Sequence, residues 1–396
     1  MDNSELFDKE NTTANAGKSS KGKVLFSLLI GAFCFIIFAG GITLFTGEDR
    51  EFSESENRVL APAPDFSFYA VKDGSFMKAF ETYFTDQFIF RDEIIRLKTF
   101  ADRLTGKTEV GGVYIGEEGY LFSVPAPFDE KKQEIMKKIS AFAESNKDSK
   151  VTFMLSPNSS HIYKDKLPAH LTLEDQKAQT EKLQKYTESK KVNFINLYDA
   201  FSAQKDEIQL FYKTDHHWTT DAAYIAFSEL MKSWKKSTAG VKFNFLPVAD
   251  DFQGTLSSKS GVNSSGDIIE ICVPQNSALT YVVDYEDGEK KTASLFDGSK
   301  LQQKNKYEVF AGGNYGKITI RTTSSEKDTL LMVKDSYANC MLPMLTPFFA
   351  KIVVIDPRYT KEKLSAVIEE NDFSHILFLY NMDTFLGDTS LEGFIA

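Results

Sequence analysis

The segment Val24–Phe45 constrains this chain more than any other feature, because it contains no charged residue and is rich in Phe, Ile, Leu and Gly. Its length matches the roughly 20 apolar residues that a helix needs to cross a bilayer. Three lysines precede it and an acidic stretch follows it: Lys18, Lys21 and Lys23, then Glu48, Asp49, Glu51, Glu54 and Glu56. Basic residues favour the cytoplasmic side. We therefore expect a single-pass membrane protein with a cytosolic N-terminus and with residues 47–396 extracellular.

A cleaved signal peptide is the alternative for this segment. Its apolar region would be unusually long, and no clear small-x-small cleavage site precedes the acidic stretch. These features favour an uncleaved anchor. The expected parts of the chain are a disordered cytoplasmic tail (1–23), a transmembrane helix (24–45), a linker with an N-terminal scaffold (46–128) and an α/β domain (129–396).

Composition narrows the class of protein. The net charge is −10 and the pI is about 5.2, which argues against nucleic-acid binding. Hydrophobic residues make up 42% of the chain, enough for a large folded core. The cysteines (Cys34, Cys272 and Cys340) lie far apart and form no Cys-x-x-Cys motif. The sequence therefore indicates neither a structural zinc site nor a disulfide framework, and it leaves a Cys272–Cys340 bridge open.

The scaffold region contains a spacer, a helical pattern and a hairpin pattern. Ala61–Pro64 is an extended spacer after the membrane segment. Phe68–Leu104 has helical apolar spacing, and we expect a helix pair whose aromatic side chains are core residues. Val113–Phe122 is typical of a hairpin with its turn at Gly116–Gly119.

From residue 130 onward helical and strand patterns alternate, which favours a parallel α/β sheet flanked by helices. The expected elements are Glu130–Ser145, Val151–Leu155, Ala178–Ser189, Val192–Leu197, Thr329–Val333, Lys351–Ile355 and Ile376–Tyr380. Functional side chains then belong in loops at the carboxyl ends of strands, a placement that Asn158, His161, Asp215 and His217 fit.

Residues 240–325 interrupt this alternation. They are rich in Gly, Ser, Asn and Asp, and we expect a β-rich insertion over the active face. Its short β-type runs are Ile268–Val273, Leu279–Val283, Tyr307–Phe310 and Ile318–Arg321.

The run Phe211–Trp218 places Asp215, His216 and His217 side by side at the start of an amphipathic helix, with Thr219 or Thr220 as its N-cap. A general base needs an orienting carboxylate on one imidazole nitrogen and a reactive hydroxyl at the other. Asp215 and His217 can supply the first half. Two alternatives remain: a capped helix start with solvated imidazoles, and a zinc or iron site, for which no further His or Cys lies nearby.

A second motif, Lys334–Asn339, follows the apolar strand Thr329–Val333 directly and precedes a helical pattern that Pro343 and Pro347 interrupt. At such a strand–turn–helix junction Ser336 can point its hydroxyl above the sheet edge, where backbone N–H groups can bind an oxyanion. The alternative is that Asp335 or Ser336 only caps the helix. Pairing with the Asp-x-His run favours the functional interpretation, because each motif supplies what the other lacks.

Together these motifs resemble the DHHW family of bacterial surface proteins, which is related to SGNH-hydrolase-like alginate O-acetylation proteins. The resemblance covers most of residues 50–390. It includes Asp215-His216-His217-Trp218, Asp335-Ser336-Tyr337, Glu56-Asn57-Arg58, Phe84–Phe88 with Arg91-Asp92, Gly312-Gly313-Asn314 and Ile355–Tyr359. It implies an SGNH-like α/β domain over 129–396 with the triad Asp215, His217 and Ser336.

The sequence departs from the SGNH pattern in two respects. The order is Asp, His, Ser, as in the alginate O-acetylation branch, and Lys334 stands where a glycine is usual. No asparagine is clearly the oxyanion donor of the family; Asn158, Asn314 and Asn381 are candidates, and each could equally form a turn. Arg358 could bind a carboxylate or acyl oxygen, or form a surface ion pair. We assign these four residues, with His216 and Tyr337, to substrate binding.

The resulting hypothesis is a membrane-anchored O-acyltransferase or esterase that acts on a cell-surface or secreted polysaccharide through a serine ester. The expected acyl group is acetyl, and no cofactor or metal is expected. The resemblance implies a membrane acyltransferase partner that delivers the acyl donor. The alternative is a non-catalytic surface protein that binds glycan or organises the cell wall. The sequence does not distinguish transfer from hydrolysis.

Overall fold

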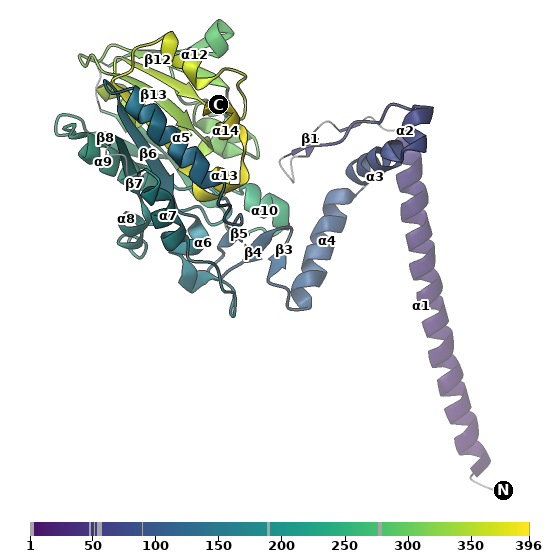
Figure 1. Cartoon of the computed structure of the whole chain (residues 1–396). Helices are drawn as coiled ribbons and strands as arrows, with labels where there is room; N and C mark the ends of the chain where they lie inside the picture. Colours follow the sequence, from purple (N-terminus) through teal and green to yellow (C-terminus); the bar gives the residue numbers. More distant parts are fainter. Residues whose placement is uncertain are drawn as a thin grey trace. The chain divides into compact units, whose positions relative to one another are not determined.

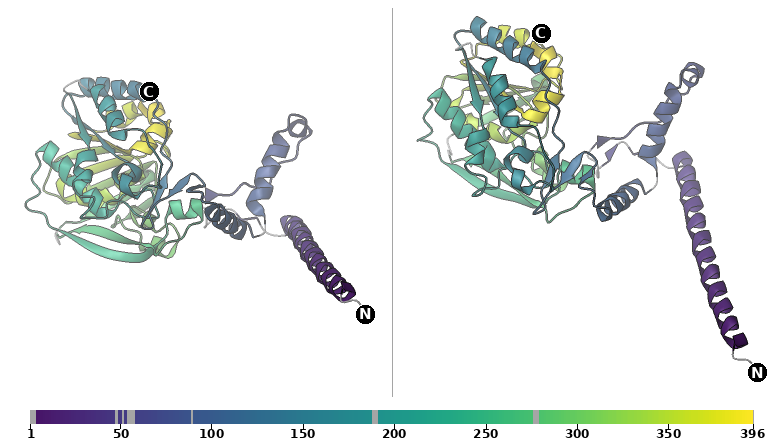
Figure 2. Two further views of the ribbon diagram at one scale, coloured as in Figure 1. Left: turned by 90° about the horizontal axis from the view of Figure 1, so that it is seen from below. Right: turned by 60° about the horizontal axis from the view of Figure 1, so that its bottom comes forward.

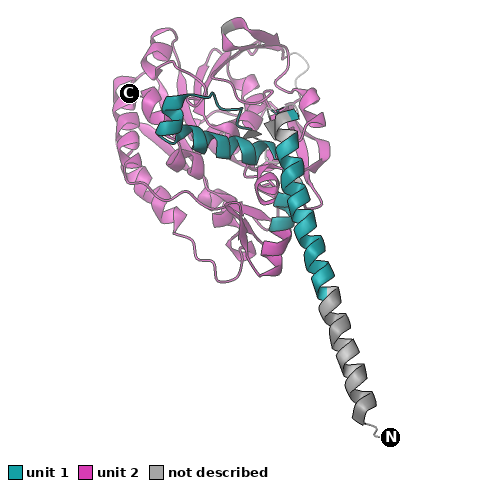
Figure 3. Cartoon of the chain, turned by 90° about the vertical axis from the view of Figure 1, so that its right-hand side faces the viewer, with its two compact units in different colours: residues 1–98 teal, residues 99–396 magenta. Residues whose placement is uncertain are grey.

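The structure is a computed structural model, and it describes residues 4–46, 49–50, 52–53, 58–88, 90–187, 191–275 and 279–395. The chain divides into two compact units, Met1–Lys98 and Thr99–Ala396, which Figure 3 shows in different colours. Each unit is described by itself. Several residues named above lie outside the described ranges: Glu48, Glu51, Glu54, Glu56, Asn57 and Ser189.

The first unit begins with one long helix, α1 (Ser4–Thr46), whose segment Gly22–Ile42 is long and apolar enough to cross a membrane. Such an N-terminal helix serves either as an anchor or as a signal sequence. The prediction of a disordered tail is wrong for residues 4–23, which continue the helix. No proline precedes Thr46, so no residue in this polar segment forces the helix to end.

Three helices follow where the sequence predicts a helix pair. They are α2 (Phe68–Lys72), α3 (Ser75–Gln87) and α4 (Arg91–Leu104). Gly74, between the first two, has a φ of +82°, which glycine adopts without strain. This conformation separates α2 from α3 and explains why the helical pattern of the sequence is divided here.

The aromatic side chains of α3 are mostly not core residues, contrary to the prediction. Tyr83 is buried, and its Oη donates a hydrogen bond to Asp49 Oδ1 over 2.8 Å. The others are only half-buried, and neighbouring rings along the helix contact one another: Phe76, Phe80, Phe84 and Phe88. A two-stranded ladder of β1 (Phe52–Ser53) and β2 (Arg58–Val59) completes the unit.

The second unit is built on an eight-stranded sheet with the order β11-β10-β12-β14-β13-β15-β6-β7. The strands from β14 to β7 are parallel, and β12, β10 and β11 extend the β14 edge in antiparallel pairing. The SGNH-like α/β architecture is thus present, with a mixed sheet. The bounds are β6 Lys150–Ser156, β7 Val192–Asn196, β10 Tyr281–Tyr285, β11 Lys290–Thr292, β12 Lys317–Thr322, β13 Thr329–Lys334, β14 Lys351–Ile355 and β15 His375–Asn381.

The region 240–325 is therefore not a separate insertion. Its first two strands, β8 (Phe243–Phe252) and β9 (Asp267–Pro274), form a ribbon of their own, whereas β10 to β12 belong to the main sheet. The predicted β-type run Tyr307–Phe310 is instead the 3-10 helix η4 (Lys306–Val309). Tyr307 and Val309 in this turn are buried in the core. The apolar pattern of the segment therefore reflects contact with the core and not strand pairing.

Side chains alternate between two hydrophobic cores along the central strands, as the two-residue repeat of a strand requires. On β15, Leu377 and Leu379 enter one core, whereas Ile376 and Phe378 enter the other. Helices cover both faces of the sheet (Figure 1 and Figure 2). The core that contains Ile376 and Phe378 is covered by α5 (Lys132–Ser145), α7 (Gln176–Lys185), α12 (Leu364–Glu369), α13 (Met382–Gly387) and α14 (Ser390–Ile395). The core that contains Leu377 and Leu379 is covered by α6 (Ser159–Ile162), α8 (Tyr198–Ser202), α9 (Thr220–Trp234) and α11 (Leu342–Leu345).

The predicted hairpin is confirmed. It consists of β4 (Val113–Ile115) and β5 (Leu121–Ser123), joined to β3 (Glu109–Val110) in a three-stranded sheet. Leu256, on the short helix α10 (Thr255–Ser260), packs against this sheet in a small core with Val113 and Leu121.

The parallel strands bring several sequence motifs to one edge of the main sheet. The strands β6, β13, β14 and β15 all end there, because parallel neighbours share their direction. Their carboxyl ends lead into Asn158, Ser336, Arg358 and Asn381. The fold therefore gathers most of the predicted site residues from segments far apart in the sequence.

Candidate active site

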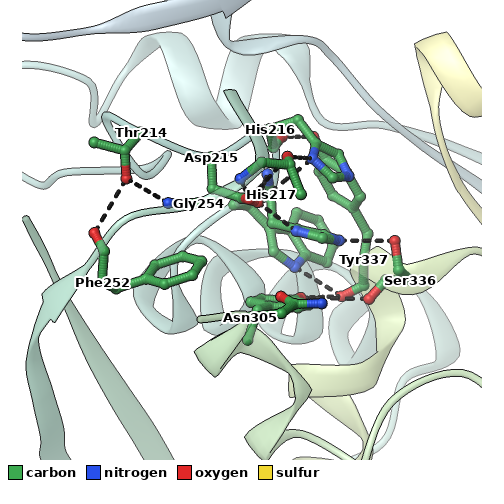
Figure 4. Close-up of polar contacts among 12 residues, drawn as sticks. Thr214, Asp215, His216, His217, Phe252, Gly254, Asn305, Ser336 and Tyr337 are labelled. Atoms are coloured by element: carbon green, nitrogen blue, oxygen red, sulfur yellow. Dashed lines mark hydrogen bonds and ion pairs between the residues drawn. The ribbon is translucent and has the colours of Figure 1, made fainter. Parts of the chain in front are cut away.

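Three side chains form a continuous hydrogen-bonded chain (Figure 4). Ser336 Oγ lies 2.7 Å from His217 Nε2, and His217 Nδ1 lies 2.5 Å from Asp215 Oδ1. The residues Asp215, His217 and Ser336 are 0%, 6% and 8% exposed, so water does not compete strongly for these contacts. With its Nδ1–H donated to the carboxylate, His217 presents an acceptor nitrogen to the serine hydroxyl.

The loop that carries Asp215 and His217 is closed by its own backbone. Phe211 and Trp218 form an isolated antiparallel bridge, and Tyr212 N–H donates to His217 O over 3.2 Å. The Thr219 side chain accepts a hydrogen bond from Ala222 N–H, which confirms the predicted N-cap of α9. The acid and the base are thus held between a closed loop and a capped helix.

A brace from α10 fixes the far side of Asp215. Thr255 donates two hydrogen bonds to Asp215 Oδ2, from its N–H over 2.7 Å and from its Oγ1 over 3.0 Å. A Cβ on Gly254 would overlap the Asp215 carboxyl, so only glycine allows this approach. Burial alone would raise the pKa of the Asp215 carboxyl, but the imidazoles of His216 and His217 and the donors around it hold that pKa well below its usual range.

Ser336 lies at the start of a 3-10 helix, η5 (Ser336–Met341), directly after β13. Asp335 caps this helix: its Oδ1 accepts a hydrogen bond from Tyr337 N–H over 2.9 Å, and its Oδ2 accepts one from Asn381 N–H over 2.7 Å. The capping role expected as an alternative thus falls to Asp335 and leaves the Ser336 hydroxyl to His217. Among the residues that the structure describes, none accepts a hydrogen bond from the Ser336 backbone N–H.

Aromatic side chains hold the two halves together. The Tyr307 ring stacks on the His217 imidazole with a centroid distance of 3.8 Å and an interplanar angle of 10°. Trp218 Nε1 donates to Tyr337 O over 2.8 Å, and Tyr337 Oη donates to the His216 carbonyl. Sequence reasoning missed Tyr307, Gly254 and Thr255, because no local pattern shows which distant loop approaches an imidazole or a carboxylate.

Comparisons with known proteins identify the kind of domain. Residues 113–303 match the family described as the SGNH hydrolase-like domain of acetyltransferase AlgX. This stretch of the chain is therefore similar to an SGNH hydrolase-like domain. The resemblance inferred from the sequence is confirmed at this level. No curated protein matches the chain.

Solved structures agree on the fold of this SGNH-like domain. A DHHW family protein from Eubacterium siraeum is similar with a TM-score of 0.60 and 19% identity, over 72% of this chain and 96% of that one. Bacillus cereus PatB1, in a structure with a sulfonyl adduct, has a TM-score of 0.58 and 19% identity, over 70% of this chain and 97% of that one. At this level of identity the likeness establishes the fold alone.

A pocket of about 490 Å³ lies beside the hydrogen-bonded chain of Asp215, His217 and Ser336, and it is lined by their sequence neighbours His216 and Tyr337. Five of the six residues assigned to substrate binding line it: Asn158, His216, Tyr337, Arg358 and Asn381. Asn314 does not line the pocket. Its Oδ1 accepts hydrogen bonds from Lys334 Nζ over 3.3 Å and from Asn339 Nδ2 over 3.1 Å. His161 also lies apart from this pocket, with its Nε2 3.1 Å from Glu174 O.

The asparagine side chains in the pocket are already engaged. Asn158 Nδ2 donates to Asp383 Oδ1 over 2.6 Å, and Asn381 Nδ2 donates to the carbonyls of Ser156 and Pro157. The Asn381 amide thus donates both of its hydrogens, whereas the Asn158 amide keeps one N–H. The Ser336 N–H, at the start of η5, is the better placed donor.

Arg358 belongs to a buried charge cluster and not to a surface ion pair. Its Nε and Nη2 bind both oxygens of Asp356, over 2.8 and 2.6 Å, and Lys334 Nζ reaches Asp356 Oδ2 over 3.2 Å. Lys334 and Asp356 are fully buried. Lys334, which stands where a glycine is usual before the Asp-Ser pair, thus forms a buried ion pair with Asp356 two positions before Ser336.

The ligand atoms of Asp215, His216 and His217 lie within 4.8 Å of one another, so the metal alternative has a geometric basis. Each residue is already hydrogen bonded, however: His216 Nδ1 lies 2.7 Å from Thr255 Oγ1, and both Asp215 oxygens accept N–H donors. The contacts therefore fit an acid–base pair better than a cation. Cys272 and Cys340 are free thiols, so the bridge left open by the sequence is not formed.

Proposed function

We propose that this chain is an O-acyltransferase that carries an acyl group, most simply acetyl, on Ser336. The observation that supports this is the hydrogen-bonded chain Asp215–His217–Ser336 at the carboxyl edge of the sheet. The match of residues 113–303, which contain Asp215 and His217 but not Ser336, to the SGNH hydrolase-like domain of acetyltransferase AlgX supports the acetyl group. The assignment of Ser336 as nucleophile, His217 as base and Asp215 as orienting acid is part of this proposal.

The first half of the reaction acylates the serine. Ser336 Oγ attacks the acyl carbonyl carbon of the donor while its proton passes to His217 Nε2. The Ser336 N–H stabilises the developing oxyanion. The bond between the carbonyl carbon and the leaving oxygen then breaks, and His217 returns the proton to that oxygen. Asp215 stabilises the imidazolium that forms between these steps.

The second half transfers the acyl group to a hydroxyl. An acceptor hydroxyl enters the 490 Å³ pocket and attacks the acyl-serine carbon, with His217 taking its proton. Collapse of this intermediate releases Ser336, which regains a proton from His217. If water takes the place of the acceptor, the same residues perform ester hydrolysis.

We further propose that the acceptor is a cell-surface or secreted polysaccharide. The apolar helix segment Gly22–Ile42 supports a membrane anchor, and the basic residues before it support an extracytoplasmic catalytic domain. A membrane acyltransferase that delivers the acyl donor is part of this proposal by resemblance to alginate O-acetylation. The rival proposal is a non-catalytic surface protein that binds glycan.

Labelling and mass measurement test the enzyme against its rival. The full-length chain in detergent is treated with a fluorophosphonate probe, and separately with 4-nitrophenyl acetate before mass analysis. Ser336 should be labelled and should carry an acetyl group, and Ser336→Ala should lose both. Ser228→Ala, on the exposed face of α9, is the matched control and should retain both. If Ser336 is never modified, the surface-binding role becomes the better account.

A further inference from the structure

One wall of the active-site pocket carries a pair of residues that the acylation chemistry does not use. Asn158 Nδ2 donates to Asp383 Oδ1 over 2.6 Å, and Ala126 N–H donates to the same oxygen over 2.9 Å. Asn158 Oδ1 is buried and has no hydrogen-bond partner. Among the described residues, none donates to Asp383 Oδ2. The Asn158–Asp383 pair therefore leaves two acceptor oxygens beside the pocket without a donor, together with the second N–H of the Asn158 amide.

The fold holds this pair firmly in relation to the nucleophile. Asp383 N–H donates to Asn381 Oδ1 over 3.0 Å, and Asn381 N–H donates to Asp335 Oδ2 over 2.7 Å. Asp335 directly precedes Ser336. On the other side, Asn158 N–H donates to the buried Gln176 Oε1 over 2.9 Å. A group bound by the pair is thus positioned with respect to the serine hydroxyl by backbone hydrogen bonds.

The unpaired acceptor oxygens indicate which kind of ligand the Asn158–Asp383 pair can bind. Asn158 is 5% exposed, and a buried acceptor without a partner is costly and uncommon in proteins. Burial also raises the pKa of Asp383, although the Ala126 N–H and the Asn158 amide oppose this. A ligand that donates hydrogen bonds to both residues would restore the interactions that these groups lose on leaving water.

The other charged groups of the pocket do not cancel this preference. Arg358 is bound through two nitrogens to Asp356, and Asp388 accepts hydrogen bonds from Ser390. Lys259 lines the pocket from an exposed position on α10, and its charge helps to lower the pKa of Asp383. Water and salt screen a charge at an exposed position, so Lys259 weakens the preference without reversing it. An anionic group placed against the Asn158–Asp383 pair would meet the Asp383 carboxylate, and the pair would offer it one donor, the second N–H of the Asn158 amide.

We propose that the Asn158–Asp383 pair is an acceptor-sugar subsite that binds hydroxyl or ammonium donors and discriminates against uronates. This inference rests on the proposed acyl transfer, because it assigns the subsite to the group that receives the acyl chain. The sugar presents two hydrogen-bond donors to the pair, which directs a neighbouring hydroxyl toward the acyl-serine. A neutral N-acetylhexosamine or hexose supplies hydroxyls, and a de-N-acetylated amino sugar supplies an ammonium group.

The test measures transfer from 4-nitrophenyl acetate to three acceptors with the full-length chain in detergent. The acceptors are N-acetylglucosamine oligomers, glucosamine oligomers and oligouronates, which are neutral, cationic and anionic. The variant Asp383→Asn keeps the shape of the side chain and removes its charge. Asn158→Ala removes the buried acceptor without touching the Ala126 hydrogen bond. Asp372→Asn, on an exposed loop, is the control.

For the wild type, kcat/KM should be at least tenfold lower with the oligouronate than with the better of the other two. Asp383→Asn should raise the acceptor KM about tenfold or more, the size of one charge-assisted hydrogen bond, and Asn158→Ala should raise it about threefold or more. A larger effect on the cationic sugar identifies an ammonium group; equal effects identify hydroxyls.

Two results would overturn the inference: an acceptor KM within twofold of wild type in both variants, or an oligouronate used as well as the neutral sugar. Fluorophosphonate labelling of Ser336 in each variant shows that the fold persists. Failure of the proposed acyl transfer has a different signature, because then Ser336 is not acetylated in any variant or in the wild type.

Discussion

At the residue scale, the Asp215 carboxylate is held in place by several hydrogen bonds and by burial. Its two oxygens accept hydrogen bonds from the His217 ring, the His217 backbone N–H and both donors of Thr255, and the side chain is fully buried. A carboxylate held in this way stays ionised across the physiological pH range, since its pKa lies well below the usual value. It therefore fixes one tautomer of His217, which leaves Nε2 free to accept the Ser336 proton.

The two adjacent histidines should differ in importance. His217 bridges Asp215 and Ser336, whereas His216 contacts Thr255 Oγ1 and only lines the pocket. His217→Ala should lower the rate of Ser336 acetylation by on the order of 10²-fold or more, because a general base is lost. His216→Ala should cost clearly less. Time-resolved mass measurement of the acyl-enzyme gives both rates, and equal losses or the reverse ranking would contradict the assignment.

At the element scale, the short helix α10 acts on the site through one glycine. Gly254 is the N-cap of α10, and a Cβ there would overlap the Asp215 carboxyl. Gly254→Ala should displace Asp215 and lower the acetylation rate about tenfold or more, as misplacement of a catalytic group does. Gly240→Ala is the matched control, because no atom lies within 4 Å of its added Cβ and its φ is not positive. Unchanged acetylation in Gly254→Ala would mean that α10 does not brace the acid.

The elements that sequence could predict are those with a local signal. The apolar runs of β6, β13, β14 and β15 and the amphipathic pattern of α9 lie within a few residues of their predicted bounds. Because parallel strands share a direction, their carboxyl ends bring Asn158, Ser336 and Asn381 together, and this too followed from the pattern. The hairpin of β4 and β5 had its glycine turn.

The elements that sequence missed depend on long-range contacts. The strands β10 to β12 have the same β-type pattern whether they pair with each other or with β14, so only the register Lys317↔Ile355 shows that they extend the main sheet. Tyr307 lies in a 3-10 turn, and its ring stacks on His217, a residue 90 positions earlier (307 − 217), which no local pattern can show. Pocket position likewise separates Asn158 from Asn314, which equally suited an oxyanion site by sequence.

At the scale of the whole molecule, buried histidines link folding of the second unit to pH. His375 is 2% exposed and His161 is 3% exposed, and burial lowers the pKa of each to about 4. An unfolded histidine titrates near 6.5. Between these values the unfolded chain binds more protons than the folded one, so the free energy of unfolding falls as pH drops from 7 toward 4.

A substitution at His375 tests this linkage. His375 packs edge-on against Trp234 and Phe349, so His375→Phe suits the site sterically. The loss of unfolding free energy between pH 7 and pH 5 should shrink by about 1–2 kcal/mol in this variant. Urea denaturation followed by tryptophan fluorescence measures it, because Trp218 and Trp234 both lie in the second unit. An unchanged pH slope would mean that His375 is protonated in the folded state.

The two units of the chain differ in how they bury apolar side chains. The segment Gly22–Ile42 is apolar and almost wholly exposed, whereas residues 99–396 have their own buried core. If the segment is an uncleaved anchor with the basic residues inside, protease added to intact cells should degrade the second unit. The full-length mass should be found in the membrane fraction before digestion. A cleaved signal sequence would instead give a shorter, released chain, and digestion only after cell breakage would reverse the orientation. A polysaccharide acceptor outside the membrane can meet Ser336 in the first two cases but not in the third. A reversed orientation would therefore contradict the proposed reaction, whereas a cleaved signal sequence would contradict only the anchor.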